Sequence, residues 1–153
     1  MTKLQTTLAL LALLPAGWAS AQEKLSGQAT LNVTETMTIT VGDSPNHQMF
    51  YTRMEGTLKA EGPLNNARYE VVEFFDTALA NNGGYKTFTL EDGSKIFARY
   101  EVTEPGSTPK GTIKLTGGTE KYAGISGTGS FQGKFNESFT VLEDTIEVQY
   151  TMK

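Results

Sequence analysis

The sequence predicts an all-β protein, an eight-stranded antiparallel up-and-down β-barrel. Apolar and polar residues alternate along several segments, as in strands with one buried face. Clusters of Gly, Pro, Asn and Asp separate these segments at short intervals, and hardly any segment has the helical period. A sandwich also fits such a pattern, but consecutive hairpins close most simply into a barrel. Eight strands enclose an interior that side chains fill or that holds one small ligand.

The first 21 residues follow the plan of a secretory signal peptide. Lys3 supplies a positive charge, residues 8–14 an apolar core, and residues 19–21, Ala-Ser-Ala, a small-residue cleavage pattern. Because the apolar core is shorter than the ~20 residues that span a bilayer, we favour cleavage over a membrane anchor. We expect residues 22–153 to form one exported β-barrel domain, periplasmic or extracellular, without a transmembrane segment after cleavage.

Charge and composition exclude several classes of function. Loss of Lys3 with the leader leaves 12 basic residues against 17 acidic ones, a formal charge of −5 that opposes nucleic-acid binding. Cys is absent and His47 is the only histidine, so we predict no metal site, no cofactor and no disulfide. A lone turn histidine without a serine elbow also argues against an acyl-transfer triad.

The first strand is predicted over residues 29–41. Its odd positions are apolar except for Glu35, and its even positions are Thr or Asn. This alternation places Met37 on the inner face. An ionised carboxylate on an apolar face costs several kcal/mol, as an order of magnitude, unless it is paired, hydrated or protonated, so Glu35 is a candidate site residue. Residues 42–46, Gly-Asp-Ser-Pro-Asn, then form a turn.

Seven further strands complete the predicted barrel. In chain order they cover residues 50–61, 67–77, 85–90, 95–103, the region of 113–115, 128–139 and 145–152. Both faces of 67–77 carry charged and aromatic residues, so its inner face is not assigned. Asp92-Gly93 is the strongest hairpin signal, because both residues tolerate a positive φ. Positions 96, 98, 100 and 102 then share one face.

Residues 116–129 form a glycine-rich segment that resembles a phosphate-binding loop only superficially. The segment lacks the Gly-Lys-Ser/Thr ending of a P-loop and the G-x-G-x-x-G order. A structural role fits better. Gly117-Gly118 allows a tight turn, Tyr122 and Ile125 supply apolar anchors, and the glycines at 127 and 129 let the next strand bend.

The same segment resembles the allene oxide cyclase and dirigent barrel superfamily. The resemblance rests on Gly-Gly-Thr at 117–119, the aromatic Tyr122, Gly124 and the step at 127–129; it covers 115–131 best. It implies an eight-stranded barrel with an apolar cavity, in several members a site that cyclises or couples an unsaturated hydrophobic substrate, and a homo-oligomer. In the plant cyclases the first strand carries an inward carboxylate, which corresponds to the region of Glu35. Their following Asn is replaced here by Met37, and their pocket Cys is absent.

These observations give a set of candidate site residues. Glu35 is the catalytic candidate, since a carboxylate in a water-poor cavity stabilises positive charge that develops on a substrate; the alternative is a carboxylate paired with Arg or Lys at the barrel mouth. Tyr69, Tyr100, Tyr150 and Met37 are ligand-binding candidates, the tyrosines as hydrogen-bond donors or alternatively as core residues.

Two functions fit this sequence. The first is an exported β-barrel that binds a small hydrophobic ligand or serves as a structural or interaction module. The second is a cyclase or isomerase acting on an unsaturated hydrophobic substrate in the barrel cavity. They differ in whether polar groups converge inside the cavity, so the sequence leaves open whether the chain is an enzyme.

Overall fold

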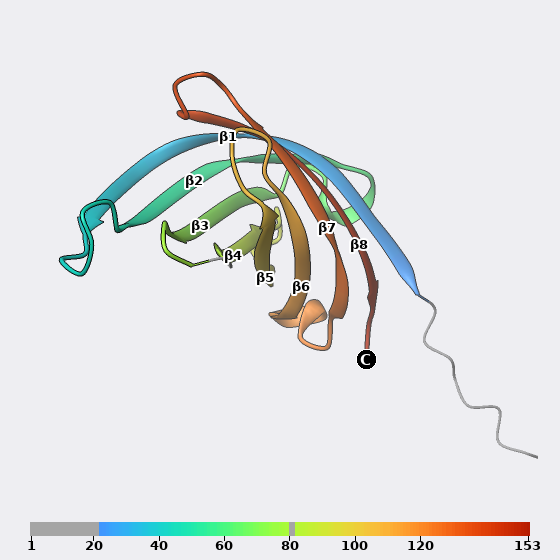
Figure 1. Cartoon of the computed structure of the whole chain (residues 1–153). Coiled ribbons are helices and arrows are strands. Elements are labelled where there is room, and N and C mark those ends of the chain that lie inside the picture. The colour runs from blue at the N-terminus through green and yellow to red at the C-terminus, as the bar shows by residue number, and fades with distance from the viewer. Residues whose placement is uncertain (1–21, 80–81) are drawn as a thin grey trace, which may run out of the picture.

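Eight antiparallel strands close into one barrel in the computed structural model, which describes residues 22–79 and 82–153 (Figure 1). The predicted signal peptide lies outside the described residues. The strands are β1 (Glu23–Thr40), β2 (Gln48–Ala60), β3 (Arg68–Asp76), β4 (Asn82–Thr89), β5 (Lys95–Glu104), β6 (Lys110–Gly118), β7 (Ser126–Phe135) and β8 (Val141–Thr151). Each strand pairs with its neighbour in sequence, and β8 pairs with β1. The predicted eight-stranded up-and-down barrel is confirmed.

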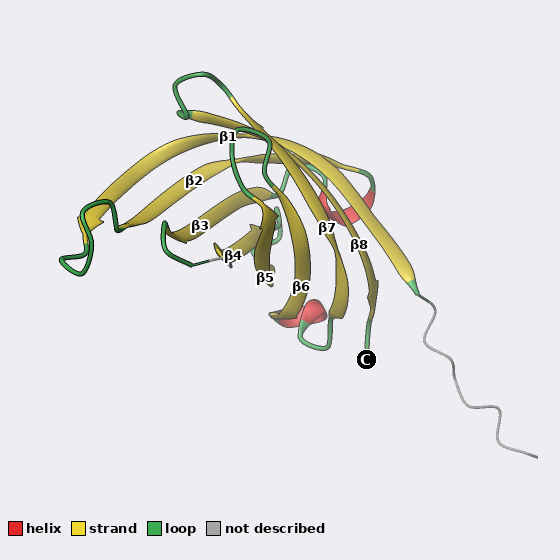
Figure 2. Cartoon of the chain, in the orientation of Figure 1, coloured by secondary structure: helices red, strands yellow, loops and turns green. Residues whose placement is uncertain are grey.

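Apolar residues from the loops plug one end of the barrel. Two short 3-10 helices lie there, η1 (Gly62–Leu64) and η2 (Glu120–Tyr122) (Figure 2). Leu64 and Tyr122 of these helices are buried, together with Leu90 and Ile125 of the neighbouring loops. At the opposite end, the loops after β1, β3, β5 and β7 are mostly exposed where they are described. We call these the closed end and the open end. No described helix is long and apolar enough to span a bilayer.

Alternation of side chains builds the core, as the sequence indicates. Along β5 the residues at 96, 98, 100 and 102 are all buried, whereas their neighbours are more exposed. The hairpin predicted at Asp92-Gly93 joins β4 to β5, and Gly93 has a φ of +83°. On β3, the strand whose inner face the sequence leaves open, Tyr69 and Val71 are buried.

A β-bulge in β1 reverses the faces of its second half. Val33 pairs with Met54, but the next pair is Glu35 with Arg53, so Thr34 is an extra residue. One inserted residue exchanges the inner and outer faces of everything that follows. Met37 is therefore 52% exposed on the outside, and the expectation that it lies on the inner face is wrong.

Beyond the bulge, β1 and β2 continue as a long ribbon. Residues 35–40 of β1 pair with β2 alone, because the pairing with β8 ends at Asn32. Figure 1 shows this ribbon curving past the other strands to the hairpin loop at the left. The shifted register turns Thr36 toward the interior, where it pairs with Thr52 and helps to line the open end.

The core predicts a clear contrast between two substitutions of similar size. Leu58→Ala, at a side chain with 0% exposure, should lower the free energy of unfolding by about 2–5 kcal/mol, since it leaves a cavity. Ile39→Ala, at a side chain that is 50% exposed beyond the bulge, should lower it by less than about 1 kcal/mol. Urea denaturation followed by circular dichroism measures both losses of unfolding free energy. Equal losses would contradict the conclusion that Ile39 lies on the outer face of β1.

Candidate ligand-binding site

An ion pair crosses the middle of the barrel. Lys86 on β4 and Asp144 on β8 are both almost completely buried, and Lys86 Nζ lies 2.7 Å from Asp144 Oδ2. In a closed ring of eight strands, β4 and β8 stand opposite each other. The long lysine side chain therefore spans the interior and ties two walls together. Asp144 Oδ1 is buried without a hydrogen-bond partner among the described residues.

Aromatic rings surround the buried ammonium group. Lys86 Nζ lies 5.1, 4.8 and 4.7 Å from the ring centroids of Tyr69, Tyr100 and Phe131, within the range of cation–π attraction. Lys86 also donates a hydrogen bond to the Tyr69 hydroxyl, which in turn donates to Asp144 Oδ2. Burial, and then Asp144, raise the pKa of Tyr69 well above its ordinary value. The hydroxyl therefore stays protonated and serves as a permanent donor.

Glu73 extends this polar cluster toward the open end. The Tyr100 hydroxyl donates to Glu73 Oε2 over 2.9 Å, while the Tyr100 ring faces Lys86. Burial raises the pKa of Glu73, although the Tyr100 hydrogen bond and the charge of Lys86 oppose that rise. Burial and the neighbouring Glu73 raise the pKa of Tyr100 well above its ordinary value. Glu73 is thus an incompletely compensated carboxylate that titrates at a higher pH than an exposed one.

A cavity of about 420 Å³ opens above Glu73. It is mostly apolar, and Glu73 is its one charged lining residue among the described part of the chain. The lining residues are Thr36, Phe50, Thr52, Glu73, Phe75, Val102, Pro105, Gly106, Pro109, Phe135 and Phe139. Its size lies within the range typical of small-molecule pockets. We call it the mouth cavity.

Comparison with known proteins finds similarity at the level of the fold. No family model matches the sequence, and no curated protein matches it. Among solved structures, that of a pterocarpan synthase dirigent protein superposes with a TM-score of 0.53 and 12% sequence identity, over 86% of this chain and 87% of that chain. This chain has the dirigent-like barrel fold. The resemblance seen in the glycine-rich segment is confirmed at the level of the fold.

The dirigent-like barrel brings together some of the predicted site residues and separates others. Tyr69 and Tyr100 belong to the buried polar cluster. Tyr150 lies near the barrel's closed end and donates to Glu23 Oε2 over 2.8 Å. Glu35 is exposed on the outer face, and its cross-strand neighbour Arg53 pairs with Glu55 and Glu70 instead. The roles proposed for these residues remain predictions, but Glu35 and Met37 do not line the mouth cavity.

Glu73, Lys86 and Asp144 were not among the site residues predicted from the sequence. A signal was present, because Asp144 interrupts an inward column of Leu142, Ile146 and Val148. The same argument that drew attention to Glu35 applies to that position. Only the closed barrel, however, shows that Lys86 lies opposite.

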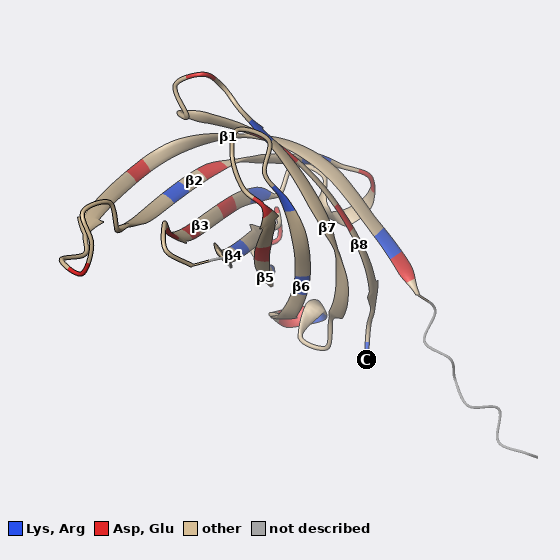
Figure 3. Cartoon of the chain, in the orientation of Figure 1, with Lys and Arg blue, Asp and Glu red and all other residues tan. Residues whose placement is uncertain are grey.

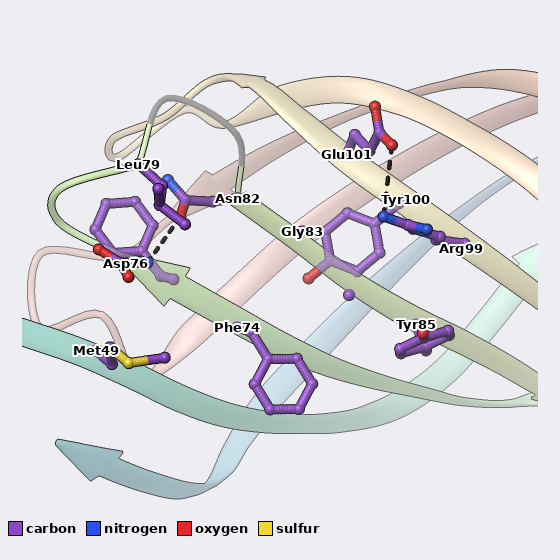
Figure 4. A pocket seen from close by; sticks show the side chains of 12 residues that line it. Met49, Phe74, Asp76, Leu79, Asn82, Gly83, Tyr85, Arg99, Tyr100 and Glu101 are labelled. Carbon is purple, nitrogen blue, oxygen red and sulfur yellow. Dashed lines mark hydrogen bonds and ion pairs between the residues drawn. The ribbon is translucent and has the colours of Figure 1, made fainter. Parts of the chain in front are cut away.

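A second hollow, of about 400 Å³, lies on the outer face around Gly83. Figure 4 shows Phe74 and Tyr85 beside it, with the Asp76–Asn82 hydrogen bond and the Arg99–Glu101 ion pair at its margins. Exposed apolar side chains, Phe74 and Tyr85 among them, border this hollow.

Basic residues occupy short separate segments of the described chain (Figure 3). The homo-oligomer implied by the resemblance remains a prediction.

His47 joins the loop after β1 to the end of β3. Its Nδ1 lies 2.6 Å from Asp43 Oδ1 and its Nε2 lies 2.8 Å from Asp76 Oδ1, and the side chain is only 12% exposed. The hydrogen bonds to Asp43 and Asp76 raise the pKa of His47. The protonated imidazolium donates to both carboxylates, which the neutral ring does not.

The buried ion pair predicts strong coupling between its two members. Lys86→Met should lower the free energy of unfolding by about 3–5 kcal/mol, because it leaves the Asp144 carboxylate uncompensated in the core. The double variant Lys86→Met/Asp144→Leu should recover most of that loss, since neither member of the pair is then left in the core without its partner. Urea denaturation gives both values, and additive losses would contradict the pairing.

The histidine clamp predicts a pH dependence of stability. The folded-state pKa of His47 is raised, so its contribution is complete below the unfolded-state value of about 6.5 and is lost as the pH rises through the folded-state value. The melting temperature should therefore decrease as the pH is raised above about 6.5 and through the folded-state pKa of His47. His47→Asn should show a smaller fall over the same range in thermal scans, and an unchanged slope would exclude the clamp as its cause.

Proposed function

We propose that the protein binds a small, largely apolar molecule in the mouth cavity of its barrel. The observation that carries this proposal is the combination of an apolar cavity of about 420 Å³ with a single carboxylate, Glu73, in its wall. Ligand pockets are typically apolar with few polar groups that orient the ligand. The dirigent-like fold supports the same reading, because a barrel of eight strands has room for one small ligand.

The asymmetry of the barrel favours the open end as the binding end. Leu64 and Tyr122 fill the closed end, and the Lys86–Asp144 pair crosses the middle. A ligand that enters past the loops after β5 and β7 therefore reaches Glu73, the one charged residue of the described lining, to which Tyr100 is hydrogen-bonded. Apolar contacts supply affinity in such a site, and the carboxylate supplies orientation.

A second candidate function is a cyclase or isomerase acting on an unsaturated hydrophobic substrate in the same cavity. The Glu73–Tyr100 pair favours it, because a fixed carboxylate in apolar surroundings stabilises positive charge that develops during rearrangement. In that case Glu73 takes the role that the sequence suggested for Glu35. Product analysis with Glu73→Gln distinguishes the two functions, since an enzyme loses turnover and a binding module has none to lose.

We also propose that the protein is exported. The support is the leader pattern of residues 1–21, with its basic start, short apolar core and Ala-Ser-Ala ending. A cysteine-free barrel needs no disulfide to fold in an oxidising compartment.

A neutral apolar dye tests the binding proposal. N-phenyl-1-naphthylamine should bind the wild-type barrel saturably, with a dissociation constant on the order of micromolar and enhanced fluorescence. Thr52→Trp should weaken binding by about tenfold or more, because the indole occupies the mouth cavity.

Thr57→Trp is the matched control for this experiment, since Thr57 lies on the same strand but is exposed on the outer face. It should leave the dissociation constant within about twofold. Dye binding that both variants weaken equally, or that neither weakens, would contradict binding in the mouth cavity.

A further inference from the structure

We propose that the preferred ligand of the mouth cavity is an organic cation, an apolar or aromatic body that carries a protonated amine. This inference rests on the proposed binding function and narrows it to one chemical class. It is carried by the charge balance of the barrel interior and by the aromatic lining around Glu73.

The barrel interior contains one carboxylate whose charge is unmatched. Lys86 and Asp144 compensate each other at 2.7 Å, so that Glu73, when ionised, leaves the interior with one excess negative charge. Glu73 receives one hydrogen bond, from Tyr100 to Oε2, and Oε1 has no hydrogen bond among the described residues. A ligand ammonium group would supply the missing positive charge and donate to Oε1.

The wall of the mouth cavity is rich in aromatic rings. Two pairs of phenylalanine rings border the cavity, Phe50 with Phe75 at 6.1 Å between centroids and Phe135 with Phe139 at 5.3 Å. Because β3 and β7 stand opposite each other in the ring of eight, the pairs flank the opening from different sides. Aromatic faces attract cations, and a carboxylate beside them adds an opposite charge and a hydrogen-bond acceptor for an ammonium group.

The electrostatics of the neighbourhood do not oppose a cation. The lining residues include no Lys or Arg. Lys86 does not line the cavity, and Asp144 neutralises its charge. The titratable groups that act on Glu73 are Tyr100, Lys86 and Asp144; β1, β2 and β7 contribute Thr36, Thr52 and Phe135 to the wall, which do not titrate. A ligand carboxylate would meet Glu73 as a like charge.

Three probes with the same ring system test the inference: 1-naphthylmethylamine, 1-naphthalenemethanol and 1-naphthoate. Their affinities are measured by competition with the neutral dye at about pH 8, well above the ordinary titration range of a carboxyl group and where the amine is protonated. The amine should bind about tenfold more tightly than the alcohol, and the carboxylate more weakly than both. As the pH falls through the pKa of Glu73, the advantage of the amine should disappear.

Glu73→Gln should bring the affinities of amine and alcohol to within about threefold of each other while the alcohol still binds. Glu70→Gln, on the outer face of the same strand, removes an equal charge and should keep the preference. The pH series on the wild-type protein gives the same information without any variant.

Each outcome decides the inference. Equal binding of amine and alcohol to the wild type would overturn it and leave the proposed binding function standing. A preference that survives in Glu73→Gln, or that Glu70→Gln also removes, would overturn it too, because the overall negative charge would then be the cause. Failure of all three probes and the dye would remove the proposed function and this inference together.

Discussion

The Lys86–Asp144 ion pair determines how the interior of this barrel is used. A charge moved from water into a protein core loses several kcal/mol of solvation, so each partner depends on the other and on its hydrogen bonds. Tyr69 and the rings of Tyr100 and Phe131 complete the surroundings of the ammonium group. Because the pair joins opposite strands, it divides the interior into an apolar plug on one side and an accessible cavity on the other.

The bulge at Thr34 has an equally large effect on the outer wall. It turns Thr36 inward toward the mouth cavity and Met37 outward. The wall above the ion pair is therefore less apolar than the sequence pattern suggests. The outer face of the β1–β2 ribbon is correspondingly more apolar. A single residue thus shifts apolar surface from the binding cavity to the exterior, where Met37 joins Phe74 and other exposed apolar side chains.

Local patterns predicted the strands, the Asp92-Gly93 hairpin and the shared face at 96–102, because alternation and turn chemistry depend on adjacent residues. The bulge was beyond such reasoning: the odd-position pattern continues through Met37 and Ile39, and nothing in it marks Thr34 as extra. Tyr69 and Tyr100 were identified as candidates, but their partners were not. Asp144 was visible as a carboxylate in an apolar column, yet its pairing with Lys86 depends on closure of the sheet and on a register between distant strands.

Tyr100 connects the buried Lys86–Asp144 ion pair to the mouth cavity. Its ring belongs to the surroundings of Lys86, and its hydroxyl donates to Glu73 in the wall of the mouth cavity. Since its pKa is raised, that hydroxyl remains a donor throughout the ordinary pH range and fixes one oxygen of the carboxylate. The other oxygen either takes up a proton, which burial favours, or accepts a hydrogen bond from a donor group of a ligand. The same desolvation that raises the pKa of Glu73 therefore strengthens its attraction for a cation that enters the cavity.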